Sequence, residues 1–491
     1  MFLGLDLGTT NVKVLVVDLD GAIVAQSSAP VERWTTPGGG VEQDIDQIWD
    51  ATCQAIRQTL AQAPGQTIQA IGVSSQGGAM QWIDARRQPI GRVISWLDAR
   101  GQPFDRQIEK EWGESYLIEH TGCNLSTTSL GQILRLQQDS PESFNAAREI
   151  GFVGDMIVER LCGRRAHDAT SLSLAMLYNP AIDNADPVLL ARLNLREKRL
   201  PDLIRPTEPA GPLQASAARA TGLPVGIPVS PAIHDQYAAA LGAGAVAAGD
   251  VLIGSGTAWV LLAVTARLTP PVAPRTFVCR HPVDGLFGQM FSMGNAGNAV
   301  ESALKAAGTR DLDAASFDAL LASASPGADG LRFQLSRNVA PSKNSRHAEM
   351  TQTAVGTFAG SDPFGSPARM LRAVVEGLAF ELTWHLERFS QAGVPLQRLV
   401  ISGPAASGRV LPQIIADVAH RPVTCVGQPA VSAFGAAVIA QALTNTKNDL
   451  SGLALSHVPA CRAVAPDADA KTYQRVLQNY FESFAAANLQ E

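Results

Sequence analysis

The first eighteen residues contain two apolar segments separated by a short polar turn. Apolar side chains dominate residues 1–7 and 12–17, and Gly8 with the following Thr9–Asn11 lies between them. Short apolar runs on either side of a glycine-containing turn are typical of a β-hairpin. We therefore expect two paired strands that are joined by a turn at Gly8.

A helical pattern follows the predicted hairpin. Asp44 stands in the N-cap position of a segment whose apolar residues recur every three or four positions. These are Ile45, Ile48, Trp49, Ile56 and Leu60. Residues 70–74 then predict a buried strand that ends in the glycine-rich turn 75–78. The order hairpin, helix, strand indicates an α/β domain.

The pattern of the first hairpin recurs later in the chain. The segment 254–260 repeats the first turn at an offset of 248 residues, since Gly256 corresponds to Gly8 (256 − 8 = 248). Residues 71–78 and 399–406 form a second similar pair, each an apolar strand entering a turn of small residues. Two related α/β halves are the favoured interpretation, and chance similarity of two Gly-Thr hairpins is the alternative. We expect domains at 1–246 and 247–491.

A long helix is predicted in the second half. Ser366 and Pro367 provide its start, and Gly393 provides its end. Its apolar stripe is Met370, Leu371, Val374, Val375, Leu378, Leu382, Leu386 and Phe389. We interpret this stripe as core packing.

Composition and charge then narrow the class of protein. The 491 residues include 39 Lys+Arg and 45 Asp+Glu, for a net charge of -6, which argues against a nucleic-acid-binding protein. The apolar stretch 251–266 is too short and too interrupted to cross a membrane. Six widely spaced cysteines indicate reduced thiols, and no basic segment precedes Asp6 as a signal peptide would require. We expect a cytoplasmic enzyme.

The two Gly-Thr turns are candidate phosphate sites. Such turns direct several backbone N–H groups at one point, and this arrangement binds phosphate oxygens without a lysine-rich loop. Asp6 lies two residues before Gly8 and could hold a Mg²⁺ ion, which proteins usually bind through one or two carboxylates. The residues thus suggest a site for a polyphosphate and its metal.

Asp235 is a candidate general base. It precedes an Ala/Gly-rich helical segment, and a carboxylate at a helix N-terminus stays ionised. Spacing alone favours a simpler role, in which Asp235 caps that helix.

The motifs taken together resemble the FGGY carbohydrate kinases. The resemblance rests on five segments in the family's order, which are 6–10 (Asp-Leu-Gly-Thr-Thr), 96–100 (Trp-Leu-Asp-Ala-Arg), 234–236 (His-Asp-Gln), 254–257 (Gly-Ser-Gly-Thr) and 402–407 (Ser-Gly-Pro-Ala-Ala-Ser). It implies two actin/hexokinase-like, ribonuclease H-like α/β domains with an interdomain cleft. It also implies ATP and Mg²⁺ as cofactors, and a small-molecule sugar or polyol as substrate, most simply a ketopentose such as xylulose. A homodimer is common in the family, and neither nucleic acid nor membrane is expected as a partner.

Family roles carry over to matching positions. Asp235 matches the catalytic base, and Asp6 with Asp235 matches the metal site. The phosphate and nucleotide positions are Gly8, Thr9, Thr10, Asn11, Lys13, Gly254, Ser255, Gly256, Thr257, Gly403 and Ser407. The sugar positions are Gln76, Gly77, Gly78, Asp98, Asp235 and Gln236. Lys13 could instead be a solvated side chain, and Asp98 could instead form a local ion pair with Arg100.

Several residues depart from the family's pattern. Gly77 and Gly78 replace the Met-His of xylulokinases, which leaves room for a bulkier sugar, and His234 replaces the usual glycine before the base. The segment 336–341 lacks the family's usual Glu-Arg-Thr-Pro run, and Pro404 with Ala405 replaces a glycine-rich turn. Two alternatives therefore stay open, an actin-like ATPase and a catalytically weak homologue that senses a sugar.

Overall fold

The chain divides into two compact units. The computed structural model describes residues 1–309, 312–335, 350–353, 355–360, 362–445, 449–467, 469–474, 476–478 and 480. The first unit comprises Met1–Ala248, Val264–Met290 and Ala430–Pro459, and the second comprises Gly249–Ala263, Phe291–Pro429 and Ala460–Glu491. The first change of unit thus falls two residues after the boundary expected at 246/247. The later segments 264–290 and 430–459 belong to the first unit. A division of the chain at a single boundary, as expected from the sequence, does not include this return.

A mixed sheet forms the centre of the first unit. Its strand order is β13-β10-β15-β6-β1-β2-β3, and β14 also pairs with β15. Strands β1 (Phe2–Leu7) and β2 (Asn11–Val17) are the antiparallel hairpin, while β6 (Ala70–Ser75) runs parallel to β1. The remaining strands are β3 (Ile23–Pro30), β10 (Ala166–His167), β13 (Asp202–Leu203), β14 (Gly211–Pro212) and β15 (Pro228–His234). The carboxyl ends of β1, β6 and β15 meet at one edge of the sheet, because these three strands are parallel.

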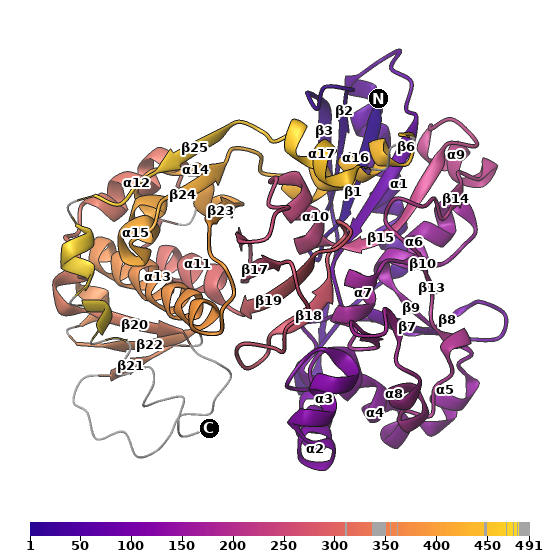
Figure 1. The fold of residues 1–491 in the computed structure, drawn as a ribbon, viewed down its shortest axis with the longest axis horizontal. Coiled ribbons are helices and arrows are strands. Elements are labelled where there is room, and N and C mark those ends of the chain that lie inside the picture. Colours follow the sequence, from indigo (N-terminus) through magenta and orange to yellow (C-terminus); the bar gives the residue numbers. More distant parts are fainter. Residues whose placement is uncertain are drawn as a thin grey trace. The chain divides into compact units, whose positions relative to one another are not determined.

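Helices cover this sheet at very short distances. Helix α1 (Ile45–Gln62) begins at Asp44, whose side chain accepts hydrogen bonds from the N–H groups of Asp46 and Gln47, as the N-cap prediction requires. Helix α16 (Val431–Ala442) packs against β1, β6 and α10 (Asp235–Gly242), and Figure 1 shows α16 beside β1.

Glycine permits this close approach. A Cβ atom on Gly72 would lie 1.7 Å from the Ala436 carbonyl oxygen, and one on Gly435 would lie 1.8 Å from the Ala238 carbonyl oxygen. Both distances are far shorter than real contacts, so only glycine fits at either position. The tight packing of α16 against α10 holds Asp235 at the edge where β1, β6 and β15 end.

The second unit repeats the same arrangement of strands. The order β17-β16-β23-β24-β25 contains the antiparallel hairpin β16 (Asp250–Ser255) and β17 (Trp259–Thr265), with β23 (Arg398–Ser402) parallel to β16. Strands β24 (Val423–Val426) and β25 (Cys461–Val464) complete this order. The buried helix α13 (Pro367–Gln391) starts after the N-cap Ser366, which confirms that prediction.

The predicted internal repeat is confirmed at the level of the strands. The bounds of β16 and β17 equal those of β1 and β2 plus 248 at every end (for example 2 + 248 = 250). The register differs by one residue, because Leu7 pairs with Val12, whereas the corresponding Ser255 pairs with Trp259. The two hairpins are therefore equivalent in topology but not identical in pairing.

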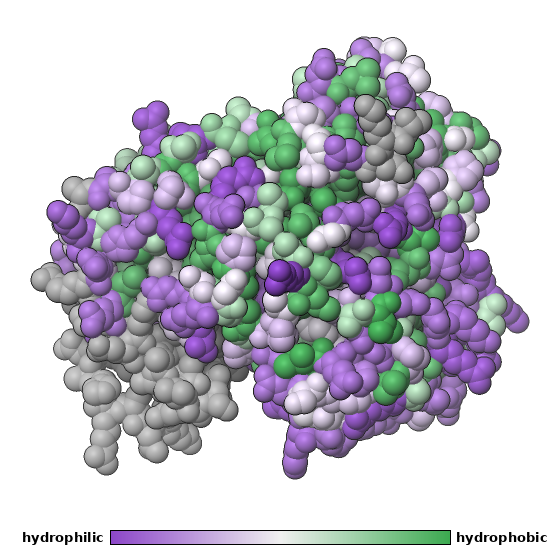
Figure 2. All heavy atoms as spheres, viewed as in Figure 1, coloured by the Kyte–Doolittle hydropathy of each residue, from purple (hydrophilic) through white to green (hydrophobic). Residues whose placement is uncertain are grey.

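The surface, the hydrophobicity of the helices and the state of the cysteines complete the description of the fold. Hydrophilic side chains are interspersed with apolar ones on the face seen in Figure 2. No helix in the described part of the chain is long and apolar enough to cross a membrane. All six cysteines lie in the described part of the chain and none of them forms a disulfide; Cys461 is exposed and the other five are buried.

Candidate functional site

The first Gly-Thr turn is a closed loop between β1 and β2. The Gly8 N–H donates to the Asn11 carbonyl oxygen at 3.1 Å, and a Cβ on Gly8 would lie only 2.7 Å from that oxygen. Glycine is thus required where the chain reverses. Thr10 is exposed at the tip, so the loop offers backbone N–H groups to a ligand.

A network of side-chain hydrogen bonds holds this loop. The Thr9 hydroxyl accepts a hydrogen bond from Trp96 Nε1 at 2.9 Å and donates one to Gln76 Oε1 at 3.0 Å. Gln76 Nε2 donates to Gln43 Oε1 at 3.0 Å, and Gln43 Nε2 donates to the Thr9 carbonyl at 3.1 Å. The side chains of Thr9 and Gln76 therefore hold the loop in place, and only the backbone N–H of Thr9 is left for a phosphate.

The sequence did not reveal all members of this network. Gln43 belongs to none of the sequence motifs, and Trp96 opens the 96–100 motif, from which no role for its side chain follows. The loss of either would loosen the turn, because each makes a hydrogen bond to Thr9.

Asp6 lies on the same sheet face as Lys13 and Ser74, its partners in register on β2 and β6. The Ser74 hydroxyl donates to Asp6 Oδ1 at 3.1 Å, and Asp6 is only 6% exposed. Burial and, to a lesser extent, the charge of Asp235 raise the pKa of Asp6 to about 6, against the lowering effects of Lys13 and of the Ser74 hydroxyl. Two neighbouring carboxylates with one nearby lysine give this part of the protein a net negative charge when both carboxylates are ionised.

Asp235 is the first residue of α10, directly after β15. The N-cap residue is His234, and its side chain makes no capping hydrogen bond. The Asp235 side chain is 26% exposed, and its Oδ1 lies 3.2 Å from His234 Nε2. Burial raises the pKa of Asp235 to about 6, against the lowering effects of the Gln236 backbone N–H and of Lys13. Burial also lowers the pKa of His234 to about 3, so this imidazole is neutral at physiological pH.

Such a carboxylate pair fits a divalent cation. Mg²⁺ prefers oxygen ligands and takes one or two carboxylates, with water and phosphate oxygens completing the shell. A cation would relieve the repulsion that the charge of Asp235 exerts on Asp6, which contributes to the raised pKa of Asp6. The donor set is therefore compatible with the expected metal.

The predicted sugar positions differ in how free their side chains are. Gln236 Oε1 is buried and has no hydrogen-bond partner among the described residues, so it could accept a hydrogen bond from a substrate hydroxyl group. Gly78 adopts a φ of 71°, a conformation that favours glycine, and a Cβ there would lie 3.2 Å from Thr128 Cβ. The space beside Gly77 is filled by the His234 side chain. The expectation of a wider pocket at Gly77 is therefore wrong.

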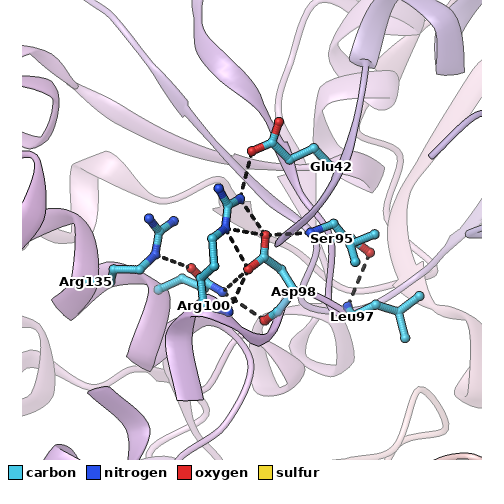
Figure 3. A network of polar contacts seen from close by, with 8 residues as sticks. Glu42, Ser95, Leu97, Asp98, Arg100 and Arg135 are labelled. Atoms are coloured by element: carbon cyan, nitrogen blue, oxygen red, sulfur yellow. Dashed lines mark hydrogen bonds and ion pairs between the residues drawn. The ribbon is translucent and has the colours of Figure 1, made fainter. Parts of the chain in front are cut away.

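Asp98 lies at the centre of a polar network (Figure 3). Its carboxylate accepts hydrogen bonds from Arg100 Nε and Nη2, from the Val41 backbone N–H at 3.0 Å and from Gln132 Nε2 at 3.2 Å. Arg100 Nη2 also contacts Glu42 Oε1 at 2.8 Å. Burial alone would raise the pKa of Asp98, but the bonds from Arg100 and Val41 outweigh it and lower that pKa. The ion pair between Asp98 and Arg100, which the sequence leaves open as an alternative role for Asp98, is thus present.

The second Gly-Thr turn, in the second unit, is braced by Ser255. The Ser255 hydroxyl donates to the Ser402 carbonyl at 2.6 Å and accepts from the Ala405 N–H at 2.9 Å. This links the end of β16 to the turn after β23, where Gly403 has a φ of 84°. The side chain of Ser255 is therefore structural, while Gly256 and Thr257 are exposed and accessible to a ligand.

Helix α11 (Ala296–Ala306) meets this second turn. The Gly297 N–H donates to the Thr257 carbonyl at 3.0 Å, and a Cβ on Gly297 would lie 2.1 Å from the Gly256 carbonyl oxygen. In the turn after β23, the exposed Ser407 hydroxyl donates to the Pro404 carbonyl at 2.7 Å. The departure noted for segment 336–341 lies outside the described residues.

Comparison with known proteins shows similarity over almost the whole chain. A probable L-xylulose kinase of Pasteurella multocida (strain Pm70) is 28% identical over 484 residues, which cover 97% of this chain and 98% of that protein. The xylulose kinase of Escherichia coli (strain K12) is 27% identical over 480 residues, 95% of each chain. The crystal structure of a xylulose kinase from Rhodospirillum rubrum superposes with a TM-score of 0.84 at 25% identity, covering 99% of this chain and 98% of that one.

Family models match both halves. Residues 1–242 match the N-terminal domain of the FGGY family of carbohydrate kinases, and residues 254–443 match its C-terminal domain. These matches show the class of enzyme, which is a phosphotransferase that uses ATP to phosphorylate a sugar or polyol. The chain belongs to the FGGY family of carbohydrate kinases.

Proposed function

We propose that this kinase transfers the γ-phosphoryl group of ATP to a hydroxyl group of a ketopentose such as xylulose. The names of the similar proteins support this substrate class, since they include a xylulose kinase and a probable L-xylulose kinase. The observation that carries the proposal is the state of Asp235, a partly exposed carboxylate with a raised pKa at the carboxyl edge of the sheet.

Asp235 is the proposed general base. A sugar hydroxyl is weakly acidic, so its proton must move to an acceptor as its oxygen attacks the γ-phosphorus. The proton passes to the Asp235 carboxylate, the new O–P bond forms, and the bond to the leaving β-phosphate oxygen breaks to release ADP. A base with a pKa of about 6 is ionised at neutral pH and yet accepts a proton more readily than an ordinary aspartate.

Asp6 and Asp235 are the proposed ligands of Mg²⁺. The ion would neutralise charge on the phosphate oxygens and favour departure of ADP. Lys13 contributes a fixed positive charge beside both carboxylates, as its effect on their pKa values indicates. This role differs from that of a solvated surface lysine.

The two Gly-Thr turns are proposed to bind the phosphates of ATP through backbone N–H groups. In the first turn these come from Gly8, Thr9, Thr10 and Asn11, and in the second from Gly254, Ser255, Gly256 and Thr257. Gly403 and Ser407 are proposed to lie at the adenosine. The braced geometry of both turns supports this role, because a nest of N–H groups binds an anion well only when it is rigid.

The sugar would be held by Gln236, by the backbone of Gly77 and Gly78, and by the segment around Gln76 and Asp98. The carboxylate of Asp98 and the amide of Gln76 are already hydrogen-bonded within the protein. They therefore offer a sugar only their remaining lone pairs and the second amide N–H of Gln76. Gln236 Oε1 is the freest acceptor of this set.

Coupled ADP release tests the proposal. The purified chain is supplied with ATP and Mg²⁺ and with a panel of ketopentoses, aldonates and alditols. The expected result is ADP release that depends on a ketopentose, with phosphorylated sugar as product. Activity on an alditol alone would overturn the substrate class. ADP release without any acceptor would favour an actin-like ATPase, and sugar-induced stabilisation without ADP release would favour a sugar-sensing homologue.

A further inference from the structure

His234 fills the space beside Gly77. A Cβ on Gly77 would lie 2.5 Å from His234 Cδ2 and 2.8 Å from His234 Nε2, and also 3.0 Å from Leu174 Cβ. These distances are shorter than side-chain contacts allow, so any larger residue at 77 must displace the imidazole or the loop that carries it. The position of the His234 imidazole therefore depends on the absence of a side chain at residue 77.

The imidazole has a single polar partner among the described residues. Nε2 lies 3.2 Å from Asp235 Oδ1, while Nδ1 is buried and has no hydrogen-bond partner in that part of the chain. A lone pair on Nε2 at this distance would repel the carboxylate oxygen, so the tautomer with the proton on Nε2 is favoured. In this tautomer the N–H of Nε2 faces Asp235 Oδ1.

The backbone of His234 is anchored independently. Its N–H donates to the Thr170 hydroxyl oxygen at 3.0 Å, and the Thr170 hydroxyl donates to Asp168 Oδ1 at 2.6 Å. Asp168 is itself buried. The backbone from which the imidazole extends is thus fixed by buried residues, and the ring lies between the Gly77 backbone and the Asp235 carboxylate.

We infer that His234 is a positioning residue for Asp235, and that Gly77 is glycine because it leaves the imidazole its place. Contact of the imidazole with Oδ1 restricts rotation of the carboxylate, and the remaining lone pairs of Asp235 are left for the substrate proton and the proposed Mg²⁺. This inference rests on the proposed function of Asp235 as general base. It makes positions 77 and 234 one functional pair rather than two separate departures from the family's pattern.

Four variants test the pair by steady-state kinetics with the full-length protein. His234→Leu keeps comparable volume without a donor, whereas His234→Gln keeps an N–H donor. We expect His234→Leu to lower kcat by about tenfold to a hundredfold with little change in the KM for ATP, because a hydrogen bond to a charged group is lost. His234→Gln should recover most of that loss. Gly77→Ala should resemble His234→Leu, and the double variant Gly77→Ala/His234→Leu should be no worse than the poorer single variant.

Two results would overturn the inference. One is equal kcat for His234→Leu and His234→Gln, which would mean that the side chain only fills space. The other is a double variant whose loss equals the product of the single losses, because independent sites behave in that way. The thermal midpoint of each variant shows whether it has folded.

A structural measurement separates this inference from the proposed function. If the unmodified chain releases no ADP with any acceptor, the proposed function fails. The crystal structure of Gly77→Ala then decides the pair. Displacement of the imidazole from Asp235 supports the pairing, and an unchanged 3.2 Å contact contradicts it.

Discussion

Lys13 lies directly opposite Asp6 across the antiparallel strands β1 and β2. Its charge lowers the pKa of Asp6 and also that of Asp235, although burial keeps both at about 6. The charge of Lys13 thus limits the protonation of both carboxylates of the proposed site. Its place in the hairpin register makes this role a consequence of the fold.

Activity should therefore decline in acid. A general base must be ionised to accept a proton, so kcat/KM should fall as the pH drops below about 6, the pKa of Asp235. Lys13→Met removes the charge that favours the ionised form, and it should shift this acidic limb to higher pH. The pH profile of kcat/KM measures the shift. Lys110→Met, at an exposed position of α2 (Gln102–Trp112), is the control and should leave the limb unchanged.

Asp235→Asn should stabilise the ligand-free protein in a pH-dependent way. A pKa raised above the unfolded value means that the ionised carboxylate is unfavourable in the folded state, so its cost is fully present above pH 6 and disappears as the pH falls toward 3.8. The variant should gain on the order of 1–2 kcal/mol at pH 8 and about half as much at pH 5, because pH 5 lies midway between the unfolded and folded pKa values. Thermal unfolding at both pH values measures this. A gain at pH 5 as large as that at pH 8 would contradict the explanation, and Asp50→Asn, on the exposed face of α1, serves as control.

Much of the fold follows from local sequence patterns. The hairpins, the 248-residue repeat, the Asp44 cap and the start of α13 at Ser366 all depend on neighbouring residues, and the structure confirms them. The one-residue change of register does not follow from the same pattern, because it depends on how each hairpin meets its own turn.

The site depends on contacts that are distant in sequence. Gln43 and Trp96 reach Thr9 across 34 and 87 residues, and nothing in their immediate surroundings marks them. The same holds for His234 beside Gly77, where the sequence suggested an open pocket and the fold fills it. Segment 430–459 likewise joins the first unit because α16 offers small residues to β1, β6 and α10.

Gly297→Ala should weaken ATP binding. The added Cβ would lie 2.1 Å from the Gly256 carbonyl oxygen, so the second Gly-Thr turn must move. We expect the KM for ATP to rise about tenfold or more, since one or more hydrogen bonds to phosphate would be lost. Gly294→Ala is the matched control, because nothing lies within 4 Å of a Cβ there. Equal KM values for the two variants would argue against a role of this turn in binding ATP.

Gly435→Ala should destabilise the first unit even though alanine favours helices. Within a helix, alanine is preferred over glycine by about 1 kcal/mol. Here its Cβ would lie 1.8 Å from the Ala238 carbonyl oxygen, so α16 would be forced away from α10. We expect a net loss of about 1–3 kcal/mol, measured by denaturant unfolding. Ser432→Ala, one turn earlier at a half-buried position, should cost little, and stabilisation by Gly435→Ala would show that the helices are not in close contact.

The turnover of Asp235→Asn tests the central claim most directly. Asparagine keeps the shape of the side chain but cannot accept the proton, so ketopentose-dependent ADP release should fall by about 10²–10⁴-fold. Binding of the sugar, measured by calorimetry, should persist. Near-normal turnover by Asp235→Asn would contradict the assignment of Asp235 as the general base.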